Sequence, residues 1–181
     1  MIIGVVSDTH DNMPKIKEAV EVFNREGVNL VIHLGDYVSP FSLRPFDKLI
    51  CPWMGIFGNN DGEKKGLKTF SGGRIKNPPL KIDIAPLSPT FFEVRSGSHK
   101  KKSHGSSQIK NKRIVAVHDL ATFQRNTKCN VVLYGHSHIP EIRREKRYLM
   151  LNPGECGGWL SHKSSVALLN TVNLEPRIIH L

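Results

Sequence analysis

Short apolar runs, each followed by a polar motif, constrain the fold of this chain more than any other feature. The run Ile2–Val6 is continuous and rich in β-branched residues, which is typical of a strand buried on both faces. Residues 14–26 then carry apolar side chains at helical spacing, and residues 29–34 form a second apolar run. With a third run at 53–57, this strand–helix–strand rhythm predicts a parallel sheet covered by helices.

The rest of the chain gives weaker signals. Residues 41–49, interrupted by Pro45, and residues 120–127 each predict a short helix. Residues 64–89 are rich in Gly, Pro and Lys and predict little regular structure apart from a strand at 81–84. Further strands are expected at 91–94, 113–117, 131–134, 148–151, 166–169 and 177–179. We expect the first two of these to pair antiparallel, and residues 1–181 to form a single domain.

The polar motifs supply a set of residues that suits metal binding. They are Asp8-Thr9-His10, Gly35-Asp36, Gly58-Asn59-Asn60-Asp61 and Gly135-His136-Ser137-His138, joined by His118 at the end of the run 114–117. Because ligands collect at the carboxyl ends of strands in open α/β sheets, we expect these distant motifs to converge. The candidate metal ligands are Asp8, His10, Asp36, Asn59, His118, His136 and His138.

The chemistry of this set points to phosphate esters. Carboxylate oxygen, amide oxygen and imidazole nitrogen suit hard and borderline divalent metals, and the lack of cysteine ligands argues against a structural zinc site. One shared aspartate can hold two metals about 3.5–4 Å apart and trap a bridging hydroxide. Such a pair of metals clamps the phosphoryl oxygens while the hydroxide acts as nucleophile.

In order and spacing, the motifs resemble the signature of the calcineurin-like metallophosphoesterases. Asn152-Pro153-Gly154-Glu155 also resembles the Asn-Pro-Gly motif of the small bacterial and archaeal phosphodiesterases in that superfamily. The resemblance implies an α/β fold in which two mixed β-sheets pack as a sandwich flanked by helices. It implies Mn²⁺ as the working metal, with Zn²⁺, Fe²⁺ or Ni²⁺ as alternatives. It assigns to the first metal Asp8, His10, Asp36 and His138. It assigns to the second metal Asp36, Asn59, His118 and His136, so that Asp36 bridges the two.

Two positions depart from the family pattern. Many family phosphatases have a histidine at the position of Asn60, where it acts on the leaving-group oxygen. An amide is no conventional general acid, so Asn60 favours diesters whose leaving groups need little protonation, such as aryl or nucleotide-like esters. We therefore take Asn60 as the candidate catalytic residue, with stabilisation of its own turn as the alternative. Asp119 stands where relatives often have glycine; it either orients an imidazole or perturbs the site at His118.

The net charge of +10 is concentrated in one tract. Residues 95–113 contain seven basic residues and no acidic one, which predicts a basic loop inserted in the domain. One interpretation is a solvated loop. The other is attraction of a polyanionic substrate or of nucleic acid.

Three widely spaced cysteines predict neither a disulfide framework nor a thiolate metal site, which indicates a reducing, cytoplasmic environment. No apolar run approaches the ~20 residues that cross a bilayer, and the first residues lack a basic leader. We therefore expect neither a membrane partner nor a signal peptide. The resemblance leaves a homodimer open, because small members of the family often self-associate.

The leading interpretation is a dinuclear metal-dependent hydrolase that cleaves a small phosphodiester or nucleotide-like substrate. A phosphomonoester or protein phosphatase is the second hypothesis, and Asn60 is the position that discriminates the two. A non-catalytic scaffold is the third, because some relatives of this fold have lost ligand residues and serve in protein assembly. The full set of candidate ligands in this chain argues against the scaffold.

Overall fold

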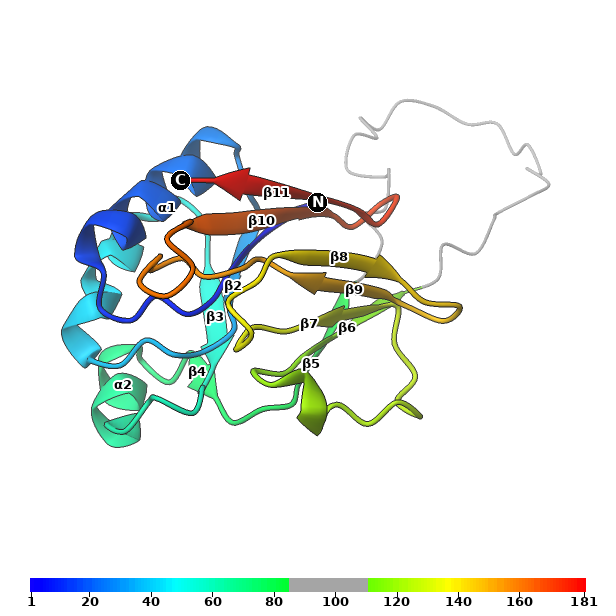
Figure 1. Cartoon of the computed structure of the whole chain (residues 1–181), viewed down its shortest axis with the longest axis horizontal. Coiled ribbons are helices and arrows are strands. Elements are labelled where there is room, and N and C mark those ends of the chain that lie inside the picture. Colours follow the sequence, from blue (N-terminus) through cyan, green and yellow to red (C-terminus); the bar gives the residue numbers. More distant parts are fainter. Residues whose placement is uncertain (85–110) are drawn as a thin grey trace, which may run out of the picture.

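The computed structural model describes residues 1–84 and 111–181, which form two mixed β-sheets with helices beside the first (Figure 1). The first sheet has the order β11-β10-β1-β2-β3-β4 and the second the order β5-β6-β7-β9-β8. The strands of the first sheet are β1 (Ile2–Val6), β2 (Leu30–His33), β3 (Trp53–Ile56), β4 (Ile75–Lys76), β10 (Ser165–Asn170) and β11 (Glu175–His180). Those of the second are β5 (Leu80–Ile84), β6 (Lys112–Ala116), β7 (Val131–Leu133), β8 (Glu141–Arg144) and β9 (Leu149–Asn152). The predicted fold class is confirmed.

Each sheet combines a block of parallel strands with strands that pair antiparallel. Strands β1, β2, β3 and β4 pair parallel with one another, whereas β10 pairs antiparallel with β1 and β11 antiparallel with β10. In the second sheet β6, β7 and β9 run parallel, and β5 and β8 close the edges in antiparallel fashion. Both sheets therefore present the carboxyl ends of several parallel strands along one edge, which is where ligands bind in such sheets.

Three helices pack on the face of the first sheet that points away from the second sheet, and a short helical turn after β6 packs beside the second sheet (Figure 1). Helix α1 (Met13–Arg25) begins at Asn12, whose side chain accepts a hydrogen bond from the Lys15 N–H. It buries Phe23 against Gly4 of β1 so closely that a Cβ at residue 4 would lie 2.6 Å from the Phe23 ring. The other helices are η1 (Pro40–Lys48), α2 (Lys64–Phe70) and η2 (Leu120–Thr122), of which η1 and η2 are 3₁₀ helices.

An apolar core fills the space between the two sheets because alternate residues of each strand point inward. Ile3 and Val5 of β1 belong to this core, whereas Val6 belongs to the helix-covered face. The core between the sheets contains buried residues from both sheets, among them Ile3, Val5, Ile32, Ile56, Ile114, Val131, Leu133, Leu149 and Leu151. Packing of this core brings the carboxyl ends of the parallel strands in one sheet next to those in the other.

Several expectations need correction. The pairing of 91–94 with 113–117 is wrong, because β5 and β7 occupy both edges of β6. Residues 91–94 themselves, and most of the basic tract 95–113, lie outside the described residues. Strand β8 and helix α2 were not predicted from the sequence, and the helix expected over 120–127 is a single 3₁₀ turn. Among residues 1–84 and 111–181, no helix is long and apolar enough to cross a membrane.

Candidate metal centre

The predicted ligands lie on five loops that follow parallel strands or their extensions at the junction of the two sheets. Asp8 and His10 follow β1, Asp36 follows β2 and Asn59 follows β3. From the second sheet, His118 follows β6, and the loop after β7 carries His136 and His138. Residues that are more than a hundred positions apart in the sequence therefore share one site.

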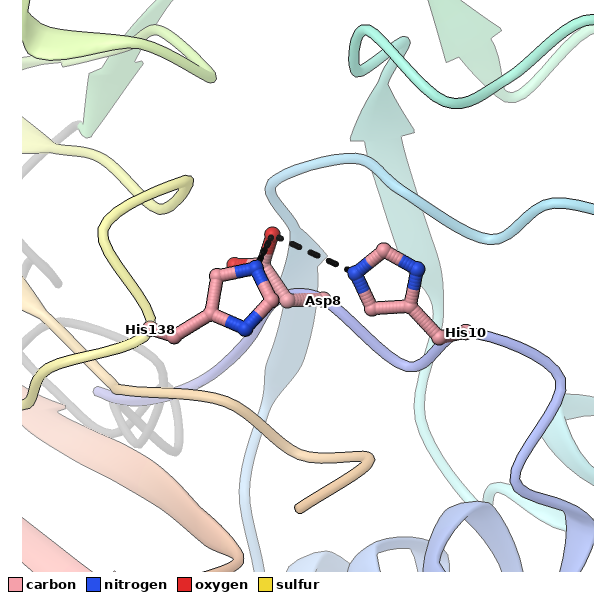
Figure 2. Close-up of side chains that lie close together, drawn as sticks. All are labelled: Asp8, His10 and His138. Carbon is pink, nitrogen blue, oxygen red and sulfur yellow. Dashed lines mark ion pairs between the residues drawn. The ribbon is translucent and has the colours of Figure 1, made fainter. Parts of the chain in front are cut away.

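One group of ligands is built on Asp8. Its carboxylate is buried, and Oδ1 lies 4.0 Å from His10 Nε2 and 3.5 Å from His138 Nε2. Figure 2 shows both imidazoles directed at the Asp8 carboxylate. The three side chains bring their ligand atoms within 4.8 Å of one another, which is close enough to hold a single cation.

A second group is built on Asp36. Oδ2 of this buried carboxylate lies 3.4 Å from His118 Nε2, and the same nitrogen lies 2.8 Å from Asn59 Oδ1. Asp36 Oδ2 also lies 3.7 Å from His10 Nε2, a member of the first group. Asp36 thus contacts both groups, and Asp8 does so as well, because its carboxylate also lies within 4.8 Å of the ligand atoms of Asp36 and His118.

His136 is the least closely connected of the predicted ligands. Its ring packs edge to face against His118 with centroids 5.2 Å apart, and its backbone N–H donates to Asp8 Oδ2. The side chain itself is exposed. All the predicted ligands are brought together, six of them through polar side-chain contacts and His136 through this ring contact.

Asn60 lies at the edge of the second group. Its backbone N–H donates to Asp36 Oδ1 at 2.8 Å, and its side-chain Nδ2 donates to Oδ2 at 2.7 Å. Asn60 is exposed, so it faces solvent over the carboxylate that links the two groups. The amide is therefore within reach of a molecule bound at the centre.

The backbone at the centre is strained. Asp8, His10, Asp36, His136 and His138 all have φ between 41° and 67°, the left-handed region that non-glycine residues rarely adopt. Such conformations cost on the order of 1–3 kcal/mol each and persist where the surrounding structure holds them, commonly at functional sites. Of the nine non-glycine residues with positive φ in the described part of the chain, five are candidate ligands, so the strain is concentrated at the centre.

The ionisation of the centre follows from burial and close contacts. Burial raises the pKa of the Asp8 carboxyl above its usual value. Burial also acts to raise the pKa of Asp36, but the adjacent His118 ring and the Asn60 donors outweigh it and lower that pKa. In turn, burial acts to lower the pKa of His118, and the Asp36 carboxylate raises it above the usual value. The surroundings of Asp36 therefore favour its ionised form, whereas burial disfavours the ionised form of Asp8.

The residues fit divalent metal ions. Among the described residues, Asp8 Oδ1 and His10 Nε2 are buried without any hydrogen-bond partner, although they face each other. Buried polar atoms normally have partners, and a cation between oxygen and nitrogen ligands would satisfy both. On His118, Nδ1 donates to the Leu34 carbonyl at 2.8 Å, which in the neutral ring leaves the lone pair of Nε2 for a metal.

Glu155, the last residue of the motif Asn152–Glu155, is a site residue to which the sequence analysis assigned no role. Its buried Oε2 lies 3.3 Å from His138 Nδ1, on the side of the ring opposite Asp8. Burial acts to raise the pKa of Glu155, but hydrogen bonds from Ser161 and Leu160 lower it to about 2. Glu155 therefore lies beside the His138 imidazole, in the place that the sequence analysis considered for Asp119. The Asp119 carboxylate instead accepts from the Ala121 N–H and begins η2.

Asp61, the last residue of the third motif, stabilises the loops that carry Asp36 and Asn59. Its buried carboxylate accepts four backbone N–H groups, those of Asp36, Tyr37, Val38 and Gly58. These donors belong to the loops after β2 and β3, so Asp61 ties two ligand-bearing loops together. The motif itself was visible in the sequence, but the partners of its aspartate were not.

Fold and site together define a metallophosphoesterase. The calcineurin-like phosphoesterase superfamily domain matches residues 1–174, and the chain belongs to this superfamily. The resemblance seen in the motifs is thus confirmed.

Comparisons with individual proteins support this family assignment. The chain is 34% identical over 185 residues to the phosphodiesterase MJ0936 of Methanocaldococcus jannaschii, across 100% of this chain and 99% of that protein. A solved archaeal phosphodiesterase superposes with a TM-score of 0.79 at 30% identity, covering 100% of both chains. Vps29 of Entamoeba histolytica, solved with Zn²⁺, superposes at 0.61 with 15% identity, covering 100% of this chain and 98% of the other. The similarity to Vps29 is a similarity of fold only.

Proposed function

We propose that this protein is a phosphodiesterase that uses two divalent metal ions at the centre described above. The observation that carries the proposal is the position of Asp36, whose Oδ2 lies 3.7 Å from His10 Nε2 and 3.4 Å from His118 Nε2. A carboxylate between two groups of nitrogen and oxygen ligands is the arrangement that two-metal phosphoesterases require. The full-length identity to a named phosphodiesterase supports the same class of substrate.

The proposed division of ligands follows the two groups. The first ion is held by Asp8, His10, Asp36 and His138, and the second by Asp36, Asn59, His118 and His136. When bound, such ions neutralise charge on the phosphoryl oxygens and supply hydroxide at neutral pH. We take Mn²⁺ as the working metal.

The protein's own residues complete the site. Glu155 holds the His138 ring in the orientation that keeps Nε2 on the metal side. Asn60 binds a phosphoryl oxygen through its amide N–H₂, which Asp36 holds at the edge of the centre. Because an amide is no general acid, Asn60 favours diesters with good leaving groups over monoesters.

The proposal is tested with Asp36→Asn in protein that is stripped of metal by a chelator and reloaded with Mn²⁺. We expect the wild type to hydrolyse bis(4-nitrophenyl) phosphate faster than 4-nitrophenyl phosphate. Replacement of the shared carboxylate should lower the diester rate by at least about 100-fold, because both ions lose a ligand. The exposed Asp47 provides the matched control Asp47→Asn, which should retain the wild-type rate. Undiminished diester turnover by Asp36→Asn would show that the proposed centre is not the catalytic one.

A further inference from the structure

A cavity of about 470 Å³ adjoins the metal centre. Its volume falls within the range of about 300–1,000 Å³ that is typical of small-molecule sites. The residues that line it are Asn60, His136, Ser137, His138, Ile139, Leu160 and Ser161. Because Asn60, His136 and His138 also belong to the centre, a phosphate ester held there has this cavity directly beside it.

The cavity also has an aliphatic wall, to which Ile139 contributes from the ligand-bearing loop after β7 and Leu160 from the loop after β9. Ile139 and Leu160 are 66% and 73% exposed, so both side chains face the open space. Among the residues that the structure describes, no lysine, arginine, aspartate or glutamate lines this cavity. The wall therefore offers contact area to an uncharged apolar group and no counter-charge to an anionic one.

The Leu160 part of the apolar wall is tied to residues of the centre by hydrogen bonds. The Glu155 carboxylate accepts the backbone N–H groups of Trp159, Leu160 and Ser161 at 2.8, 3.1 and 2.8 Å. The same carboxylate lies 3.3 Å from His138 Nδ1. On the other side, Trp159 Nε1 donates to the backbone carbonyl of His10 at 3.0 Å. The loop that carries Leu160 is thus fixed relative to the ligand residues, as a specificity wall requires.

We propose that this cavity binds an uncharged aromatic or branched aliphatic ester group of the phosphodiester, with Ile139 and Leu160 as the specificity-determining residues. The inference rests on the proposed function, because the phosphoryl group is taken to lie at the metal centre. A diester carries one negative charge and two ester groups, one of which fills the cavity against the aliphatic wall. A phosphate monoester has a second negative charge and gains no counter-charge from this wall.

The test compares the binding of two diesters that differ only in their ester groups, diphenyl phosphate and dimethyl phosphate. Binding to the Mn²⁺-loaded protein is measured by calorimetry, and each compound is also measured as an inhibitor of bis(4-nitrophenyl) phosphate hydrolysis. We expect the wild type to bind diphenyl phosphate at least about tenfold more tightly. Leu160→Ser and Ile139→Ser should each reduce this preference by about three- to tenfold, with dimethyl phosphate affinity unchanged. The control is Val172→Ser, because Val172 is 72% exposed and lies outside the cavity; this variant should keep the wild-type preference for diphenyl phosphate.

The outcomes separate this inference from the proposed function. Equal affinity of the wild type for the two diesters, or an equal loss for both in Leu160→Ser, would overturn the inference even if diester hydrolysis is intact. If the wild type prefers diphenyl phosphate, and loses that preference in both serine variants, the inference stands. That result would stand even if no diester were hydrolysed, in which case the proposed function alone would fail.

Discussion

At the scale of single residues, the position of Asp36 depends on a neighbour without a side chain. A Cβ at Gly58 would lie 2.1 Å from Asp36 Oδ1, so any larger residue at 58 displaces the carboxylate that contacts both ligand groups. A Cβ at Gly62, four positions further along, would meet no atom within 4 Å in the part of the chain that the structure describes. The two glycines therefore form a natural pair for testing how tightly the centre is packed.

We predict that Gly58→Ala lowers metal-dependent diester turnover by about 100-fold, because displacement of a positioning group by ~1 Å has effects of this size. Gly62→Ala should keep turnover within about twofold, since added methyl groups in open space cost little. Steady-state rates with bis(4-nitrophenyl) phosphate check both. Equal rates for the two variants would mean that the Asp36 carboxylate is free to shift without loss of function.

Much of the candidate site could be predicted from the sequence because its ligands occur in short local motifs. Asp8 with His10, and His136 with His138, are each two residues apart, and such spacings are visible without a structure. Glu155 could not be assigned in this way, because its partner His138 lies 17 positions away and on a different loop. Its role depends on tertiary contacts that leave no local pattern.

At the scale of elements, the loops after β2 and β3 act as one unit through Asp61. Four backbone N–H groups from these loops converge on its two carboxylate oxygens. A carboxylate can accept all four, whereas an amide offers one oxygen and replaces the other acceptor with a donor. The geometry of the unit therefore depends on a carboxylate at this position.

We predict that Asp61→Asn lowers the free energy of unfolding by about 2–4 kcal/mol, because buried N–H groups lose their acceptor. Urea unfolding followed by circular dichroism measures this change. Asp47→Asn replaces an exposed aspartate and should shift the free energy by less than about 0.5 kcal/mol. A stability of Asp61→Asn equal to that of the control would show that the two loops hold their shape without this carboxylate.

Elements with a strong apolar pattern could be predicted, and those with a weak pattern could not. Strands β1, β2 and β3 are nearly continuous apolar runs because both of their faces are covered. Helix α2 buries only Leu67, and β8 is a polar edge strand with the sequence Glu-Ile-Arg-Arg. Neither carries the periodicity that predicts an element, and both depend on neighbours for their conformation.

At the scale of the whole molecule, the centre exists only because two sheets pack together. The first sheet supplies Asp8, His10, Asp36 and Asn59, and the second supplies His118, His136 and His138. The inter-sheet core fixes the distance between the two sets, since it contains buried residues of both sheets. The predicted sandwich follows from family resemblance, whereas the pairing of β6 with β5 follows from the packing and was not foreseen.

The measurement that tests this account most directly is the metal content of the protein. After removal of metal by a chelator and titration with Mn²⁺, we predict two ions per chain by calorimetry and elemental analysis, the number that a shared carboxylate implies. His10→Ala should bind the first ion at least about tenfold more weakly and retain the second, because His10 belongs to only one ligand set. A saturating content of one ion per wild-type chain, or none, would contradict the dinuclear centre.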